Sequence, residues 1–377
     1  MTVTQENRLT HFMTKLVIDR ALSYQLLAWY RCQKENYPWR RFFAETADPY
    51  VVWVSEVMLQ QTQIKTVLPK YLDFLNHFPD VKTLALADES KLRSVVCGLG
   101  YYRRFAFLQK GAQAIVSRRL SIASGFWPTS YEEWLQVPGV GDYTASAIAS
   151  IAFDKPHPVV DGNVERVFCR LFNIQLPSNL PSLKKIFKTI AHQLIVPDAP
   201  GDFNQALMEL GQKICLIKNP KCSSCPIKVS CKSFSKKSTH LAPKPKIKKA
   251  ATDLNLRLSV LKQGSLYALR RRGPNAKFLR GARGFCTEIL EQDLTSIGLD
   301  GDVGNVVRST RVIGAFRHAI THHRLKVQVC EATGGELKSD DVAWLLQKDV
   351  EGYLESSLDK KAWHLYLKEG AKPRPIF

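Results

Sequence analysis

Four of the nine cysteines in this 377-residue chain lie in one short segment. They are separated by six, two and five residues: Cys215, Cys222, Cys225 and Cys231. Thiols clustered in this way are more typical of a metal site than of disulfides. Four soft thiolates in a single loop suit a compact iron-sulfur cluster. Structural zinc is the alternative, but zinc ribbons usually contain two separated Cys-x-x-Cys pairs, and the single pair here favours iron and sulfur.

A glutamate lies inside an apolar stretch that has helical spacing. Glu56 follows Trp53 and Val54 and precedes Val57 and Met58. A carboxylate that faces a protein core is costly when ionised, so we expect its pKa to be raised, which suits a general acid. The alternative is a buried glutamate satisfied by a structural partner.

A glycine-rich turn separates two segments with helical periodicity. Pro138 is followed by Gly139, Val140 and Gly141, and a helix is expected to begin at Asp142. Glycines allow a tight turn that leaves backbone N–H groups free at the helix start, where the dipole also favours an anion. Such a hairpin can bind a DNA phosphate without reading sequence. An ordinary helix connection containing Pro and Gly is the alternative.

A second carboxylate lies twenty residues after this turn. Asp161 follows an apolar segment and precedes another expected helix, so it could serve the chemistry of the site. The simpler interpretation is a helix N-cap, a position that Asp fills well.

The elements that must position these residues are mainly helical. Apolar residues recur at spacings of three and four from residue 16 to 234, with helix starts before residues 51–67 and 131–136. Residues 235–252 are rich in Lys, Pro and Ser and contain no acidic residue, which indicates a linker. Alternating patterns at 255–269 and 325–329 predict strands, and 341–346 resembles a helix start. We therefore expect a mainly α region at 16–234, a linker at 235–252 and an α+β domain at 253–377.

The charge balance favours a nucleic-acid partner. The chain has 54 Lys and Arg against 34 Asp and Glu, a formal net charge of +20 and a pI near 9.6. This is the electrostatic pattern of a protein that neutralises phosphates, although a basic surface of another purpose would look the same. Residues 1–20 do not resemble a signal peptide, and no apolar run is long enough to span a membrane, so we expect an intracellular protein.

The buried glutamate, the glycine hairpin with the aspartate after it, and the cysteine loop together resemble the helix-hairpin-helix, Gly/Pro-rich, aspartate superfamily of DNA glycosylases. The cysteine loop resembles that of the endonuclease III branch of this superfamily. Within that branch the chain is similar to the MutY family of adenine DNA glycosylases, closely over residues 38–234 and more loosely from 255 onward. The resemblance implies one 4Fe-4S cluster. It also implies a monomer that binds double-stranded DNA containing A:8-oxoguanine or A:G mispairs, associated with the nucleoid in a bacterial cytoplasm and not with a membrane.

The resemblance assigns roles to residues at matching positions. Glu56 is expected to protonate the adenine and help activate water, and Asp161 to stabilise the oxocarbenium-like sugar with support from Asn163. The base must first leave the stack. At other matching positions, the wall of the adenine pocket would be formed by Trp39, Arg40 and Gln205. The space that the extruded base leaves in the duplex would be held by Gln61 and Tyr101. The DNA backbone would be bound by Gly139, Val140 and Gly141.

One position distinguishes two sister enzymes by chemistry. Endonuclease III-type enzymes carry a lysine two residues beyond the last glycine of the hairpin, and its amine forms a Schiff base. Tyr143 occupies that position here, and a phenol cannot form an imine. We therefore expect a monofunctional enzyme. An endonuclease III-like glycosylase for oxidised pyrimidines and a non-catalytic iron-sulfur DNA-binding protein are the alternatives.

The resemblance is weaker in the second domain, which should have a Nudix-like fold and recognise 8-oxoguanine. Thr321 and His322 match a polar pair in the family's recognition loop, but Ile320 replaces the usual aromatic residue. Residues 281–286 replace a tryptophan-containing segment of the family. The glutamate-rich metal-binding helix of true Nudix hydrolases is not found in the sequence. A degenerate domain that only adds DNA contact is the alternative.

Overall fold

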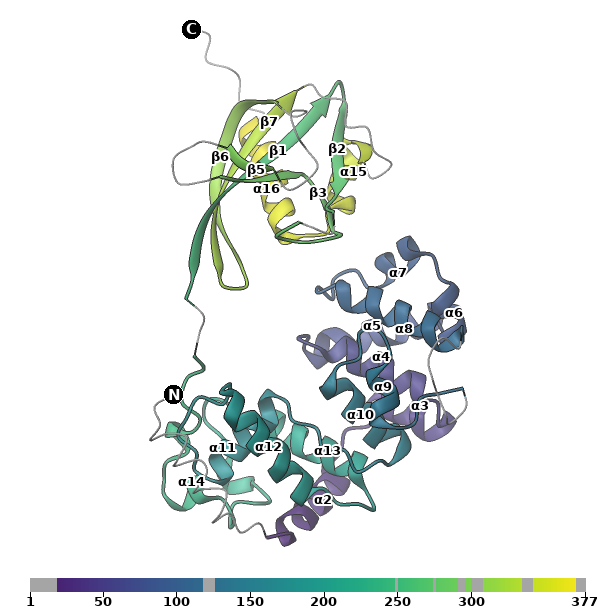
Figure 1. Ribbon diagram of the computed structural model, residues 1–377, viewed down its shortest axis with the longest axis vertical. Helices are drawn as coiled ribbons and strands as arrows, with labels where there is room; N and C mark the ends of the chain where they lie inside the picture. The colour runs from purple at the N-terminus through teal and green to yellow at the C-terminus, as the bar shows by residue number, and fades with distance from the viewer. Residues whose placement is uncertain are drawn as a thin grey trace. The chain divides into compact units, whose positions relative to one another are not determined.

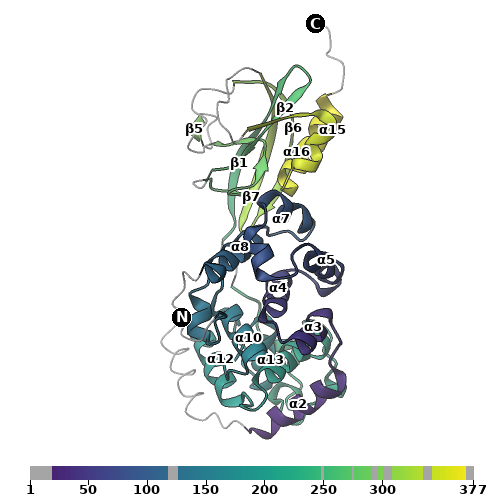
Figure 2. The ribbon, with the colours of Figure 1, turned by 90° about the vertical axis from the view of Figure 1, so that its right-hand side faces the viewer.

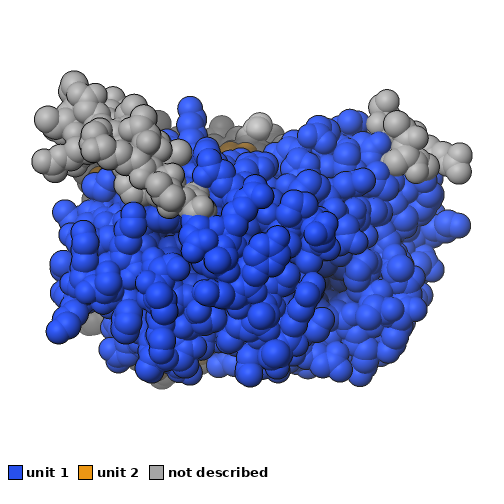
Figure 3. Space-filling model, turned by 90° about the horizontal axis from the view of Figure 1, so that it is seen from below, with its two compact units in different colours: residues 1–247 blue, residues 248–377 orange. Residues whose placement is uncertain are grey.

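The computed structural model describes residues 19–117, 126–247, 250–273, 276–290, 296–299, 308–333 and 342–370. The expected start of the helical region at residue 16 lies outside these ranges. The chain divides into two compact units, residues 1–247 and 248–377, which are coloured separately in Figure 3. Among the described residues, no helix combines the length and apolar character that crossing a bilayer requires.

Unit 1 is helical, as the apolar spacing predicted (Figure 1). Several helices begin where the sequence offers Pro, Asp or Ser, as at α4, where the Asp48 carboxylate accepts a hydrogen bond from the Tyr50 N–H. The longer helices of the unit are α2 (Ala21–Gln33), α3 (Pro38–Thr46), α4 (Pro49–Leu59), α5 (Ile64–His77), α8 (Arg103–Val116), α10 (Asp142–Phe153), α11 (Gly162–Leu171), α12 (Pro181–Leu194) and α13 (Pro200–Glu209). Shorter ones are α6 (Val81–Leu86), α7 (Glu89–Val95), α9 (Tyr131–Leu135), η1 (Leu210–Ile214), η2 (Cys222–Ser224), α14 (Lys232–Ser235) and η3 (Thr239–Leu241).

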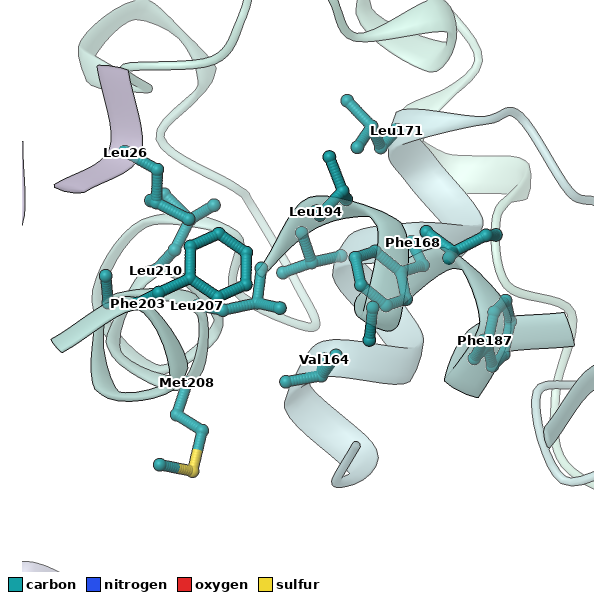
Figure 4. Close-up of a cluster of buried hydrophobic side chains, with 14 of the residues drawn as sticks. Leu26, Val164, Phe168, Leu171, Phe187, Leu194, Phe203, Leu207, Met208 and Leu210 are labelled. Carbon is teal, nitrogen blue, oxygen red and sulfur yellow. The ribbon is translucent and has the colours of Figure 1, made fainter. Parts of the chain in front are cut away.

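Among the residues that the structure describes, two hydrophobic clusters form the interior of unit 1. One contains buried side chains of α4, α5, α6 and α8, with Trp53 and Phe74 at most 1% exposed. The other joins α2 to α11, α12 and α13; Figure 4 shows Phe168 of α11 and Phe203 of α13 within it. Helix α10 contributes to both, because Ala147 belongs to the second cluster and Ile148 to the first. The small residues of α10 let both clusters pack closely against one helix.

The segment expected as a linker, residues 235–252, contains the boundary between the units at 247 and 248. Its first part packs on unit 1. Ala242 is 1% exposed, and Arg170 donates from Nε to the Ala242 carbonyl at 2.9 Å. Asn179 exchanges two hydrogen bonds with the backbone of Ile247, at 3.0 and 3.1 Å. Both of these contacts lie within unit 1.

Unit 2 is an α+β domain, as expected. Its mixed sheet has the order β3-β2-β1-β4-β5, with β7 parallel to β1, β6 antiparallel to β7, and β8 antiparallel to β2. Figure 2 shows the long helix α16 lying along the sheet. The elements are β1 (Thr252–Gln263), β2 (Leu266–Arg271), β3 (Arg283–Gly284), β4 (Cys286–Leu290), β5 (Ser296–Leu299), β6 (Arg308–Ile320), β7 (His323–Thr333), β8 (Val342–Leu346), α15 (Gln347–Tyr353) and α16 (Ser357–Gly370).

The helix start expected at residues 341–346 is wrong. Val342–Leu346 form strand β8, in which Trp344 pairs with Ala268 of β2, and helix α15 begins only at Gln347. The tertiary fold decides the structure of this segment, because β2 offers an edge with which it can pair and because Val and Trp are favoured in strands. The expected strand at 255–269 is divided by a turn at Gly264, where φ is +58°.

A buried ion pair lies in the interior of unit 2. The Asp359 side chain is fully buried, and the Arg272 guanidinium donates to both of its oxygens, at 2.8 and 3.0 Å. The backbone N–H of Phe285 donates to the same carboxylate at 3.0 Å. Gly284 is required beside it, because a Cβ there would lie 2.4 Å from the Asp359 oxygen. The pair therefore ties α16 to the β2–β4 region.

Replacing Asp359 should destabilise unit 2 strongly. Asp359→Asn leaves the Arg272 guanidinium buried without its counter-charge, which costs about 3–5 kcal/mol. We expect hydrogen exchange in β1 and β4 of the full chain to accelerate while α11 of unit 1 keeps its protection. Asp349→Asn, at an exposed position in α15, is the matched control. Equal protection of β1 in both variants would contradict this role.

Candidate active site

One large cavity in unit 1 gathers most of the residues singled out in the sequence. Its volume is about 1420 Å³, and Glu56 of α4, Tyr143 of α10 and Asp161 at the start of α11 all line it. Glu56 lies on α4, whose buried side chains belong to the first hydrophobic cluster, and Asp161 precedes α11, whose buried side chains belong to the second. The cavity therefore lies where the two clusters meet. The other expected residues in its lining are Trp39, Arg40, Gln61, Gly139, Gly141, Asn163 and Gln205.

The Glu56 side chain is nearly buried, at 8% exposure, on a helix whose other residues are almost all inside. The Tyr143 hydroxyl donates to Glu56 Oε2 at 3.1 Å and also contacts Met208 Sδ at 3.3 Å. Burial, together with the nearby Asp161 charge, raises the pKa of Glu56 to about 7 against the opposing hydrogen bond from Tyr143. A carboxyl with this pKa holds a proton that it can donate near neutral pH.

Asp161 is both an N-cap and a cavity residue. Its Oδ1 accepts from the backbone N–H groups of Asn163 and Val164, at 2.9 and 2.8 Å. Its Oδ2 accepts from the Asn163 side-chain amide at 2.7 Å. The simpler interpretation, an N-cap, is thus confirmed, and the same hydrogen bonds fix the carboxylate at the cavity wall.

Arg40 is held on several sides in the outer wall of the cavity. It donates from Nε to Gln205 Oε1 at 2.8 Å and pairs through Nη2 with Glu209 Oε1 at 2.5 Å. Its guanidinium also lies over the rings of Tyr30 and Tyr37, 5.4 and 5.2 Å from their centroids. The position of this charged side chain is therefore fixed by its neighbours.

Sequence reasoning missed Glu209 and the two tyrosines of this wall. Glu209 is 4% exposed and also pairs with Lys213 at 2.7 Å. Its spacing of four residues from Gln205 on one helix could have revealed it, because such residues share a face. Tyr37 stacks on Trp39 with ring centroids 4.8 Å apart, and no periodicity in the sequence indicated that contact.

The glycine turn forms between α9 and α10 as expected. Helix α9 begins with a capping box of Ser130 and Glu133. Gly139 has φ of +84°, and a Cβ there would lie 2.4 Å from Phe107 Cβ, so only glycine fits. The Val140 N–H is used inside the turn, donating to the Val137 carbonyl at 3.0 Å, and the Val140 side chain is buried.

Gln61 and Tyr101, the two residues expected to fill the space that the extruded base leaves in the duplex, lie on separate turns. Gln61 follows α4 and Tyr101 precedes α8; both are exposed, with φ of +57° and +47°. A second cavity, of about 260 Å³, is lined by both residues together with Gly139 of the hairpin. Gln61 and Tyr101 are therefore neighbours on the surface that carries the glycine turn.

The cysteine segment packs against the second hydrophobic cluster. Cys215, Cys225 and Cys231 contact that cluster, and Cys222 is half-buried. Burial raises the pKa of the Cys225 thiol to about 11, and the thiols at 215, 222 and 231 add to this effect through their charges. Across the described residues, no three His, Cys, Asp or Glu side chains lie close enough to hold a single metal ion.

Two arginines of α11 bind this segment, and one of them, Arg166, links it to Asp161; sequence reasoning missed both. Arg170 donates from Nη1 to Cys215 Sγ at 3.4 Å. Arg166 donates from Nε to the Cys215 carbonyl at 2.8 Å and from Nη2 to Asn163 Oδ1 at 3.1 Å. Because Asn163 binds Asp161, a continuous set of hydrogen bonds runs from the cysteine segment to the cavity.

Thr321 and His322 lie in unit 2, at the tip of the hairpin formed by β6 and β7. Thr321 has φ of +54°, and its hydroxyl lies 3.4 Å from His322 Nδ1. Ile320 is the last residue of β6 and packs against the core of unit 2. The segment matched to a recognition loop is therefore mostly strand, with only the polar pair in the turn.

Comparison with known proteins agrees with this geometry. Residues 54–191 match the model of the HhH-GPD superfamily base excision DNA repair protein. A solved thermostable thymine-DNA glycosylase is similar, with a TM-score of 0.50, 26% identity, and coverage of 58% of this chain and 96% of that one. Unit 1 thus has the fold of a helix-hairpin-helix DNA glycosylase.

Relatives define the family more narrowly. The chain is 41% identical over 231 residues to an adenine DNA glycosylase of Mus musculus, covering 60% of this chain and 44% of the relative. It is 30% identical over 310 residues to an adenine DNA glycosylase of Buchnera aphidicola subsp. Schizaphis graminum, covering 80% and 84%. The chain belongs to the adenine DNA glycosylase family. The match covers only 44% of the length of the Mus musculus protein. It covers only 38% of the length of an adenine DNA glycosylase of Homo sapiens.

Proposed function

We propose that this protein is a DNA N-glycosylase that removes adenine paired with 8-oxoguanine or guanine in duplex DNA. The observation that carries the proposal is that Glu56, Tyr143 and Asp161 line the same cavity. Adenine leaves poorly as an anion, so a proton donor and a stabiliser of the sugar cation are the two functions that the reaction requires.

Glu56 supplies the proton in this proposal. Its pKa of about 7 keeps a substantial protonated fraction near neutral pH. Because Tyr143 donates to Oε2, the other oxygen of the carboxyl is left to face the base. After the base departs as a neutral species, the Glu56 carboxylate helps to activate the water that completes hydrolysis.

Asp161 acts on the sugar. As the bond between C1′ and the base lengthens, positive charge grows on the sugar, and a fixed carboxylate stabilises it without having to reorient. Three hydrogen bonds from Asn163 and Val164 hold Asp161 in place before the substrate arrives. Trp39, Arg40 and Gln205 wall the space that receives the extruded base.

A substrate-panel assay tests this function. Duplexes containing A:8-oxoguanine, A:G, A:C or thymine glycol are incubated with the full chain, and base release is followed by alkaline cleavage of the abasic strand. We expect release from A:8-oxoguanine and A:G and none from thymine glycol. Release from thymine glycol alone would favour the endonuclease III-like alternative.

We also propose that the enzyme is monofunctional. Tyr143 stands where the sister enzymes carry a nucleophilic amine, and its hydroxyl is engaged with Glu56. Borohydride added during turnover should therefore trap no covalent protein–DNA adduct. A trapped adduct would contradict this assignment, because borohydride reduces an imine and some amine of the protein would then have formed one.

The cysteine segment fits the 4Fe-4S cluster that the family implies. Cys215, Cys222, Cys225 and Cys231 would hold the cluster through thiolates. Burial raises the pKa of the thiols at Cys222, Cys225 and Cys231 and so disfavours their free thiolates, which iron would stabilise. The Arg170 guanidinium, directed at Cys215 Sγ, suits a charged sulfur. When bound, the cluster would fix a loop whose Lys218, Lys221, Lys228 and Lys232 side chains are exposed and available to phosphates.

Loss of one ligand should weaken DNA binding more than the fold. In Cys222→Ser we expect the far-UV circular dichroism to keep most of its helical signal, because the core of unit 1 forms without this half-buried side chain. The dissociation constant for duplex DNA should rise roughly tenfold, as expected for losing a few phosphate contacts. Cys32→Ser, at an exposed position on α2, is the control. Equal losses of helicity and binding would contradict this prediction.

Unit 2 supplies the recognition of 8-oxoguanine in this proposal. Thr321 and His322 present polar groups at a hairpin tip, and we propose that this Nudix-like domain uses them to contact the damaged base. The partner is double-stranded DNA, bound by one copy of the protein. The substrate-panel assay tests this as well, because a degenerate domain would give equal rates on A:8-oxoguanine and A:G.

A further inference from the structure

Arg104, the second residue of α8, joins three segments of unit 1. Its Nη1 donates to the Met58 carbonyl at 3.0 Å and also to the Gln60 carbonyl. Its Nη2 donates to Thr62 Oγ1 at 2.8 Å and to the Leu99 carbonyl at 3.1 Å. One guanidinium therefore binds the end of α4, the turn after it and the glycine loop before α8.

The bonded residues flank the two exposed positions with left-handed backbone. Gln61, with φ of +57°, lies between Gln60 and Thr62, and Tyr101, with φ of +47°, lies two residues after Leu99. Such a backbone is unfavourable for residues with a side chain and persists only when the surroundings hold it. The Thr62 hydroxyl also donates to the Leu99 carbonyl at 3.4 Å, so the two turns are joined directly as well.

The guanidinium suits this position better than another cation would. Carbonyls at the end of α4 lack partners within the helix, and the forked N–H groups of arginine can satisfy several acceptors in one plane. Burial lowers the pKa of Arg104 to about 10, which leaves it charged at neutral pH. Lysine has no such fork and cannot span the same four acceptors.

We propose that Arg104 is a positioning residue that holds the Gln61 and Tyr101 turns side by side before DNA binds, so that both side chains enter the duplex together. Arg104, Gln61 and Tyr101 line the same 260 Å³ cavity beside the hairpin. This inference rests on the proposed function, in which these two side chains keep the extruded base out of the stack. Without Arg104 the protein should still bind DNA but extrude the base poorly.

The test uses the full chain with Arg104→Met, Arg104→Lys and, as the control, Arg93→Met on α7, a half-buried arginine that pairs with Glu89 of its own helix. The target adenine opposite 8-oxoguanine is replaced by 2-aminopurine, whose fluorescence rises when it unstacks. We expect the fluorescence change of Arg104→Met to fall about fivefold or more, with Arg104→Lys intermediate and Arg93→Met unchanged, since a few kcal/mol of unstacking must be offset. Anisotropy on undamaged duplex should stay within about twofold of wild type, because phosphate contacts dominate that binding.

Single-turnover adenine release separates positioning from catalysis. In Arg104→Met the rate should fall while its pH profile, set by Glu56, keeps the wild-type midpoint. A 2-aminopurine fluorescence change in Arg104→Met equal to that of the wild-type protein would overturn the inference, whether or not the pH profile of the rate is shifted. If Arg104→Met does not fold by circular dichroism, wild-type unstacking by Arg104→Lys would overturn it instead. Absence of adenine release by the wild-type protein would count against the proposed function alone, because the unstacking comparison is read independently.

Discussion

Glu56→Gln should abolish adenine release while leaving DNA binding intact. The amide can accept the hydrogen bond from Tyr143 as the carboxyl does, so the cavity should keep its shape. It cannot donate an acidic proton, and the loss of a general acid lowers rates by up to about 10⁴-fold. Single-turnover release from A:8-oxoguanine duplex, with anisotropy for binding, measures both quantities.

Glu89→Gln, at an exposed carboxylate on α7, is the matched control and should release adenine at the wild-type rate. A non-catalytic DNA-binding protein would be unaffected by either change in every assay. Appreciable base release by Glu56→Gln would mean that the proton comes from another group.

The same substitution has a distinct effect on stability. The pKa of Glu56 is raised from 4.5 to about 7 in the folded protein, so the folded state binds more protons than the unfolded state between these values. Stability contributed by this group is therefore present below about pH 4.5 and lost as the pH rises through about 7. Glu56→Gln should be more stable than wild type at pH 8, by at most about 3 kcal/mol, and no more stable at pH 4.5. The catalytic rate of wild type should also decline above pH 7, as the acid loses its proton.

Asp161→Asn should lower the rate of adenine release by about 10³-fold, corresponding to about 4 kcal/mol of lost transition-state stabilisation. Asparagine is also a good N-cap, so its oxygen can still accept from the Asn163 and Val164 N–H groups and α11 should be kept. The neutral amide no longer offsets the charge on the sugar.

Comparison with Asp161→Ala separates the two functions of this residue. Alanine removes both the cap and the charge, and it should cost a further ~1 kcal/mol of stability that asparagine does not. Urea denaturation gives the stability, and single-turnover kinetics give the rate. A rate loss confined to Asp161→Ala would show that capping, and not charge, is what the reaction needs.

Local sequence was sufficient for the parts of this site that depend on local chemistry. The apolar neighbours of Glu56 predicted its burial, and the turn at Gly139 was recognisable because a tight connection needs glycine there. Trp39, Arg40 and Gln205 could be assigned only through the family resemblance. Those three residues do line the cavity, while their roles in binding adenine stay predictions.

What the sequence did not reveal depends on contacts between distant segments. Glu209 holds Arg40, and Arg104 joins two turns. In the sequence alone, neither charged residue differs from an ordinary residue on the surface of a helix. Strand β8 was taken for a helix start because its partner, the edge of β2, lies more than seventy residues earlier in the chain. Such pairings are fixed by the tertiary fold and not by propensity.

The shared helix α10 has a consequence for how unit 1 unfolds. Ala147 and Ile148 are adjacent on this helix yet belong to different hydrophobic clusters, and a Cβ on Gly201 of α13 would lie only 2.6 Å from the Ser150 carbonyl. Neither cluster can therefore melt without exposing a face of the helix that the other needs. Loss of one cluster should therefore weaken the other, so that the two interiors lose their structure together. A larger side chain at position 201 would lower the midpoint of that joint loss of structure.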